Sequence, residues 1–78
     1  MVRFTLVDVL NRRSLRMDLP PATDVGEVRC IAEEYWCSEG FLLRNGHRIL
    51  DGSDRIAECI ADGDTVEMIP DPVLSLRL

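Results

Sequence analysis

The sequence predicts an α+β domain in which a mixed sheet packs on one main helix. Two runs of alternating apolar and polar residues come first, one amphipathic run follows, and short alternating runs return near the end. Only one long helical pattern occurs in the 78 residues, so this helix has to cover one face of the sheet. The expected order is two strands, a helix, two strands, a short late helix and a final strand.

The first part of the chain predicts a hairpin. VRFTLVDV alternates, with Phe4 and Leu6 on one face, and SLRMDL alternates again around Met17. A short polar link joins the two runs, and Pro20 and Pro21 then end the sheet region. Both runs therefore indicate half-buried strands.

The segment TDVGEV begins the main helix. Asp24 is the expected N-cap, and Glu27 three residues later completes a capping-box pattern. Gly40 suits the cap at the other end, and Trp36 is expected off the core-facing stripe, beside Arg29 and Glu33. The residues expected in that stripe are Val25, Val28, Ile31, Ala32 and Tyr35.

The second half contains the strongest turn signal. Asn45-Gly46 between apolar residues predicts a tight type I′ hairpin. DGSDRIAECI predicts a loop and a short helical turn with Ile56 and Ile60 on one side. ADGDTVEMI predicts a turn and a last strand, which we expect to return beside the first strand in parallel.

Composition excludes several classes of function. A net charge of −5 argues against nucleic-acid binding. All nine basic residues are arginine, so only the N-terminal amine could accept a conjugate. No apolar run approaches the roughly 20 residues of a membrane span, and three cysteines without a leader indicate reduced thiols. We expect a soluble, cytoplasmic, monomeric protein without a cofactor.

At this point the chain resembles the ubiquitin-like β-grasp family over residues 1–70. LLRNGHRIL stands where the family has a hydrophobic pair, a small turn, a basic residue and a leucine. DGSDRIAECIADGDTVEMI matches the family's Asp-Gly, its short helix ending in isoleucine and its final strand. The resemblance implies the β-grasp fold, and it implies recognition of proteins rather than catalysis.

The resemblance also implies an apolar patch on the exposed sheet face. The family's central isoleucine corresponds to Leu43, its last-strand valine to Ile69, and the histidine between them to Glu67, which departs from the pattern. Val9 or Leu10 would supply the apolar residue of the first turn. The alternative interpretation is that these are scattered surface residues, which are common in soluble proteins.

Residues 71–78 are expected to form a flexible apolar tail. The family's conjugated members end in Gly-Gly, whereas no glycine follows Gly63 here, which argues against a covalent modifier. The tail could add a strand to a partner's sheet or dock in its groove, or it could have no role. The residues that would carry such docking are Val73, Leu74, Leu76 and Leu78.

Other features favour a binding protein over an enzyme. The single histidine, His47, is expected in a solvated turn, and the acidic loop residues lack the spacing of a calcium loop. Trp36 is either an exposed binding residue or part of the core. We therefore expect a non-catalytic ubiquitin-like protein that binds a protein partner noncovalently. The alternatives are a modifier with an atypical terminus, or a small accessory subunit of a bacterial or archaeal enzyme or secretion complex.

Overall fold

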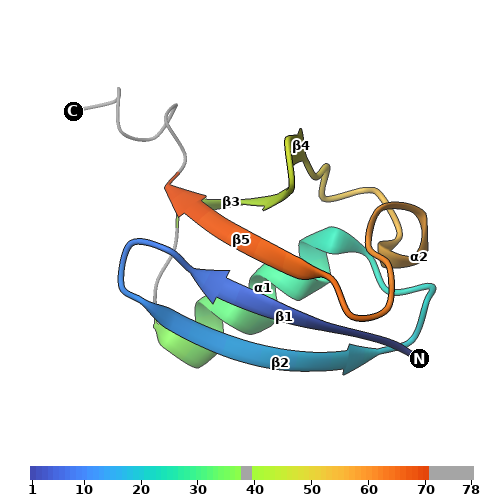
Figure 1. Ribbon diagram of the computed structural model, residues 1–78, viewed down its shortest axis with the longest axis horizontal. Helices are drawn as coiled ribbons and strands as arrows, with labels where there is room; N and C mark the ends of the chain where they lie inside the picture. The colour runs from blue at the N-terminus through green and yellow to red at the C-terminus, as the bar shows by residue number, and fades with distance from the viewer. Residues whose placement is uncertain (38–39, 71–78) are drawn as a thin grey trace.

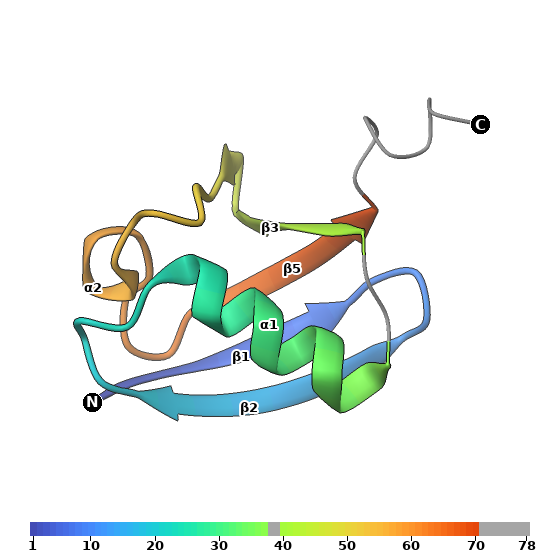
Figure 2. The same ribbon diagram turned by 180° about the vertical axis from the view of Figure 1, so that it is seen from behind.

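The predicted architecture is confirmed by the computed structural model, which describes residues 1–37 and 40–70. A five-stranded mixed sheet carries one main helix across one of its faces (Figures 1 and 2). No helix within these residues is long and apolar enough to cross a membrane. The elements are β1 (Val2–Asp8), β2 (Arg13–Leu19), α1 (Val25–Trp36), β3 (Phe41–Asn45), β4 (Arg48–Ile49), α2 (Ile56–Cys59) and β5 (Thr65–Pro70).

The strands lie in the order β2-β1-β5-β3-β4. The parallel return of the last strand is confirmed, because β5 pairs with β1 in parallel. β1 and β2 form the expected antiparallel hairpin, and β3 lies antiparallel to β5. The two segments farthest apart in the sequence thus form the middle of the sheet, which is a long-range pairing that closes the domain (Figure 1).

The core lies between the sheet and α1. Alternate residues of β1 and β5 point into it, as the period-two pattern predicted. Two isoleucines of the late helical turn close one end of it. The buried apolar residues are Phe4, Leu6, Met17, Val25, Val28, Ala32, Phe41, Leu43, Leu50, Ile56, Ile60, Val66 and Met68.

The beginning of α1 differs from the predicted capping box. Asp24 occupies the N-cap position, but its side chain makes no capping hydrogen bond. Instead, Val25 N–H donates to the Asp54 carbonyl at 2.8 Å, and Gly26 N–H donates to the Gly52 carbonyl at 2.9 Å. These loop carbonyls satisfy donors that the first helical turn leaves free, so a side-chain cap is not needed.

The end of α1 also corrects the prediction. The helix stops at Trp36, and Cys37, not Gly40, takes the left-handed cap conformation with φ 50°. Tyr35 is 65% exposed and Ile31 is 36% exposed, so neither belongs to the buried stripe. Trp36 packs partly buried against the core instead, because it continues the three- and four-residue spacing of the buried helix positions.

The turn between β3 and β4 is shifted by one residue from the predicted Asn45-Gly46 pair. Asn45 pairs with Arg48, so Gly46 and His47 form the two-residue loop. Gly46 has φ 66°, whereas a type I′ turn would need positive φ at both central residues. The Asn45 side chain donates to the Cys59 carbonyl at 2.8 Å, a contact that holds this residue at the end of the strand.

Candidate functional site

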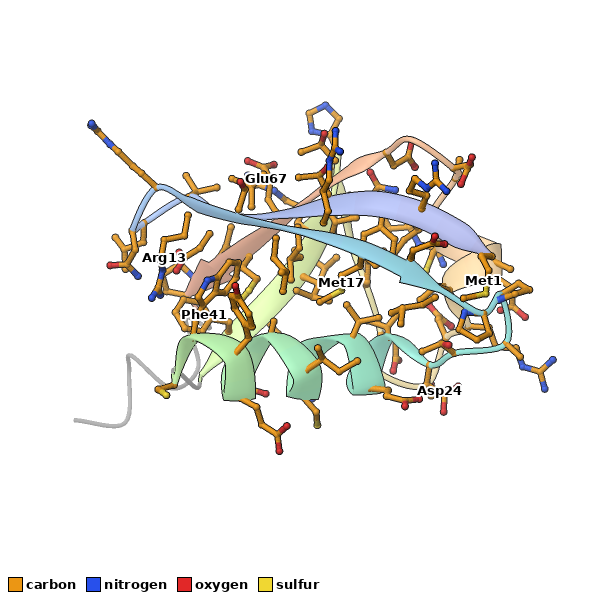
Figure 3. The ribbon with its side chains drawn as sticks, turned by 90° about the horizontal axis from the view of Figure 1, so that it is seen from below. Met1, Arg13, Met17, Asp24, Phe41 and Glu67 are labelled. Carbon is orange, nitrogen blue, oxygen red and sulfur yellow. The ribbon has the colours of Figure 1, made fainter. Side chains whose placement is uncertain are left out.

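The face of the sheet that points away from α1 is open to solvent. Figure 3 shows Glu67 on this outer face, while Met17 and Phe41 lie between the sheet and the helix. Val7 of β1 and Ile69 of β5 alternate with buried neighbours, so their side chains share the outer face with Glu67. The expected outward position of Ile69 and Glu67 is therefore confirmed.

The prediction that Leu43 lies on this face is wrong. Leu43 is 2% exposed and stands opposite Met68, which is fully buried, so both side chains point into the core. The outward residues of β3 are its neighbours Leu42 and Arg44, which are both partly exposed. A difference of one residue in register moves a side chain to the other face of a strand, which explains the error.

An ion pair occupies the middle of the outer face. Arg44 Nη2 lies 3.0 Å from Glu67 Oε1, and the side chains are 37% and 33% exposed. The buried Nε of Arg44 has no hydrogen-bond partner within the described residues. Partly exposed pairs contribute little to stability, so this pair fixes the shape and charge of the surface more than it stabilises the fold.

Apolar side chains surround this ion pair. Leu42 stands opposite Ile69 in neighbouring strands, Val7 is aligned with Glu67, and Ile49 is aligned with Arg44. Val9 directly follows β1 and is 48% exposed, and Ile49 of β4 is 49% exposed. We call this surface the sheet-face patch; its apolar members are Val7, Val9, Leu42, Ile49 and Ile69.

Trp36 does not belong to the sheet-face patch. It lies on α1, on the other side of the sheet, and packs partly buried against the core. The Arg13 guanidinium carbon lies 5.1 Å from the centre of its ring, and the Tyr35 ring meets it edge-on at 6.1 Å. The sequence left two interpretations of Trp36 open, and this packing is that of the core interpretation.

The buried carboxylate of Asp8 was not predicted from the sequence. Its side chain is fully covered and accepts hydrogen bonds from the Asn11 amide at 2.9 Å and from Arg13 Nη2 at 2.7 Å. Burial by itself raises the pKa of Asp8, but the hydrogen bonds from Asn11 and Arg13 outweigh it and lower the pKa below 3.8. Asp8 continues the inward-pointing positions Phe4 and Leu6, and this alternation was the sequence signal that could have revealed its burial.

The acidic loop residues serve as turn and loop acceptors. Asp51 accepts from the N–H and hydroxyl of Ser53 at 2.9 Å, and Asp62 accepts from Arg3 N–H at 2.7 Å. Asp64 accepts from Ala61 N–H at 2.8 Å. Within residues 1–37 and 40–70, no group of three or more histidine, cysteine or acidic residues could hold a metal ion.

The remaining predicted partner-binding residues belong to the tail. Val73, Leu74, Leu76 and Leu78 lie outside the residues that the structure describes. Their proposed docking therefore stays a prediction, and the site that can be argued from geometry is the sheet-face patch.

Comparisons with known proteins agree with the architecture. No protein-family description and no curated protein matches the sequence. A solved ubiquitin of Caldiarchaeum subterraneum superposes with a TM-score of 0.80 at 20% identity, over 88% of this chain and 91% of that one. ATBAG1, solved in complex with HSP70, superposes with a TM-score of 0.80 at 14% identity, over 99% of this chain and 44% of that one. The chain has a ubiquitin-like β-grasp fold.

Proposed function

We propose that this chain is a non-catalytic ubiquitin-like protein that binds a protein partner noncovalently through the sheet-face patch. The observation that carries the proposal is the clustering of five apolar side chains around one ion pair on an open sheet face. Apolar residues that gather on a solvent-exposed surface are typical of protein-binding sites. The Arg44–Glu67 pair would add directional contacts within that surface.

The ion pair distinguishes this surface from a uniformly apolar patch. Covering this ion pair removes water from both charges, which costs free energy unless the partner supplies further hydrogen bonds to them. We therefore expect the partner to be selective for this chain. Cys30, Cys37 and Cys59 form no disulfide within the described residues, which is compatible with our proposal that binding takes place in the cytoplasm.

The proposal is tested with a variant that shortens the apolar side chains. Leu42→Ser combined with Ile69→Ser removes two aligned members of the patch, and we expect at least tenfold weaker partner binding, which corresponds to about 1.4 kcal/mol. Thr65→Ser, on the same outer face but at the far end of β5, serves as the matched control. Partners are recovered from the native cells by tagged protein and quantified for each variant.

Two results would overturn the proposal. The first is recovery of the same partners by the double variant and by the control, with both proteins folded by circular dichroism. The second is a ladder of heavier species that survives denaturation, because covalent attachment would make the chain a modifier. A single denatured band together with partner loss in the double variant would support noncovalent binding.

A further inference from the structure

The two edges of the sheet are unequal. β4 forms one edge with two residues, and β2 forms the other with seven. Within residues 1–37 and 40–70, β2 has only β1 as a neighbouring strand. A long free edge offers a row of backbone donors and acceptors that can pair with another strand. Figure 3 views the molecule towards this edge, with α1 beneath the sheet.

An apolar flank of α1 lies beside this edge. Gly26 donates to the Gly52 carbonyl, so that flank of the helix faces the loop after β4. At 3.6 residues per turn, Ile31 and Tyr35 project from the opposite flank, towards β2. Figure 2 shows the last turn of α1 over β2, and Arg13 of β2 contacts the Trp36 ring there. The edge therefore combines free backbone groups with exposed apolar side chains.

We propose that a second copy of this chain pairs antiparallel along β2, with a twofold axis at Met17. The two sheets would join into one continuous sheet, and the two copies would present the same surface to each other, as in isologous dimers. Leu15 and Leu19, partly buried on the inner face of β2, would stand opposite each other across the axis. The exposed flanks with Ile31 and Tyr35 would lie on the same side of the joined sheet.

Charge complementarity favours this register, and it favours a second copy of the chain as the strand that pairs with β2. On the outer face of β2, a twofold axis at Met17 places Arg16 opposite Asp18 of the second copy, and the same contact occurs twice. An axis at residue 16 would instead oppose two arginines, and an axis at residue 18 would oppose two aspartates. Like charges directly opposite in a sheet are destabilising, and opposite charges are stabilising. Of these three registers, the one with its axis at Met17 makes the strand complementary to itself in charge.

The intramolecular contacts of Arg16 and Asp18 do not prevent the proposed pairing. Arg16 is exposed and forms no ion pair within the described residues. Asp18 meets Arg3 at 3.5 Å, with side-chain exposures of 46% and 75%. Such exposed pairs are weak, so Asp18 can accept a second guanidinium. The sheet-face patch lies mainly on β5, β3 and β4, so it remains accessible in the dimer.

This proposal goes beyond the proposed function and replaces the monomer expected from the sequence. Its test is sedimentation equilibrium of the full chain over a range of concentrations at low salt. The wild type is expected to show a mass that rises towards that of a dimer. Arg16→Asp and Asp18→Arg each place like charges in both contacts, so each variant alone is expected to associate at least tenfold more weakly.

Mixing the two variants provides the decisive measurement. One copy then carries aspartate at positions 16 and 18 and the other carries arginine at both, so every contact across the axis again joins opposite charges. We expect the equal mixture to recover association to within about threefold of the wild type. The double variant with both substitutions in one chain should recover it too, because its two contacts are merely reversed.

Three results would overturn the proposal. A wild type that stays monomeric at every concentration would leave the edge to a different occupant, such as a strand of another protein. Folded single variants that associate as strongly as the wild type would place the contact elsewhere. Failure of the mixture to recover association would exclude this register. The Leu42→Ser, Ile69→Ser variant should self-associate normally, so loss of partner binding and loss of the dimer are distinguishable.

Discussion

The two ends of α1 are attached to the rest of the molecule in different ways. At its beginning, backbone N–H groups of Val25 and Gly26 donate to carbonyls of the loop at 52–54. At its end, side chains form the attachment, because Asp8 holds Arg13 and the Arg13 guanidinium lies over Trp36. One end depends on how closely two backbones approach, and the other depends on the identity of three side chains.

This difference predicts how each end responds to substitution. The backbone contact tolerates changes of most side chains but excludes added volume at the point of closest approach. The side-chain contact tolerates added volume at the surface but fails when one charged partner is removed. The following predictions separate these two kinds of attachment, with Trp36, the single tryptophan, as the fluorescent reporter of unfolding.

Gly26→Val is expected to have the largest effect. A Cβ at position 26 would lie 3.1 Å from the Gly52 carbonyl oxygen, and valine adds two further carbons at this point. One of the two backbones would have to move by a few tenths of an ångström, which lengthens the hydrogen bond between these residues. We expect the free energy of unfolding to fall by about 2–3 kcal/mol, measured by urea denaturation.

A matched substitution separates crowding from the cost of a branched residue in a helix. Cys30→Val introduces the same side chain at an exposed position of α1. We expect it to change the free energy of unfolding by less than about 0.5 kcal/mol. Equal losses in both variants would show that the close approach of Gly26 to Gly52 contributes nothing specific.

Asp8→Ala tests the other end of the helix and is expected to cost about 2 kcal/mol. The substitution leaves Arg13 and Asn11 without their buried acceptor. Arg13 is 35% exposed and can regain water, so the loss stays below that of a deeply buried pair. The measurement is again urea denaturation, together with the emission wavelength of Trp36, which should move to the red as the guanidinium leaves the ring.

Asp18→Ala is the control for this prediction. Asp18 also pairs with an arginine, Arg3, but both side chains are exposed. At a concentration where the chain is monomeric, we expect a change of no more than about 0.5 kcal/mol and unchanged Trp36 emission. If Asp18→Ala costs as much as Asp8→Ala, burial of the carboxylate is not what makes the Asp8 contact important.

The fold could be predicted from the sequence because its main signals are local. The alternation around Phe4 and Met17 defined the inner faces of two strands, and both residues are buried as expected. The backbone docking of Gly26 on Gly52 could not be predicted, because it joins two segments through atoms that every residue has. The same limit explains why Asp24 was assigned a side-chain cap that the structure does not contain.

The binding surface was predicted less accurately than the fold. The run Phe41, Leu42, Leu43 is apolar at three consecutive positions, so it does not reveal which residues point inward. The family resemblance then assigned the outer face to Leu43, as the counterpart of the family's central isoleucine, whereas the structure assigns it to Leu42 and Arg44. The ion pair between Arg44 and Glu67 arises from strand pairing across 23 residues, which no local pattern displays.

Acid is expected to weaken the attachment of α1 at both of its ends, and the loss of stability for each carboxylate is expected to be smaller than that of the substitutions above. Asp51 stabilises the loop at the beginning of the helix, and hydrogen bonds from Ser53 lower its pKa below 3.8. At the other end, the pKa of Asp8 is also lowered, because hydrogen bonds from Asn11 and Arg13 outweigh the effect of burial. A folded-state pKa below the unfolded one means that the unfolded chain binds more protons in acid.

The stabilisation from these carboxylates is therefore fully present above the unfolded pKa near 3.8 and is lost as the pH falls through the lower folded-state values. We expect urea midpoints to be constant from about pH 7 to about pH 5 and to decrease below about pH 4. Asp8→Asn and Asp51→Asn should each flatten this decrease. Added salt should leave the Asp51 part unchanged, because its partners are the uncharged N–H and hydroxyl of Ser53. A decrease that is equally steep in the wild type and both variants would mean that other carboxylates control the acid sensitivity of the fold.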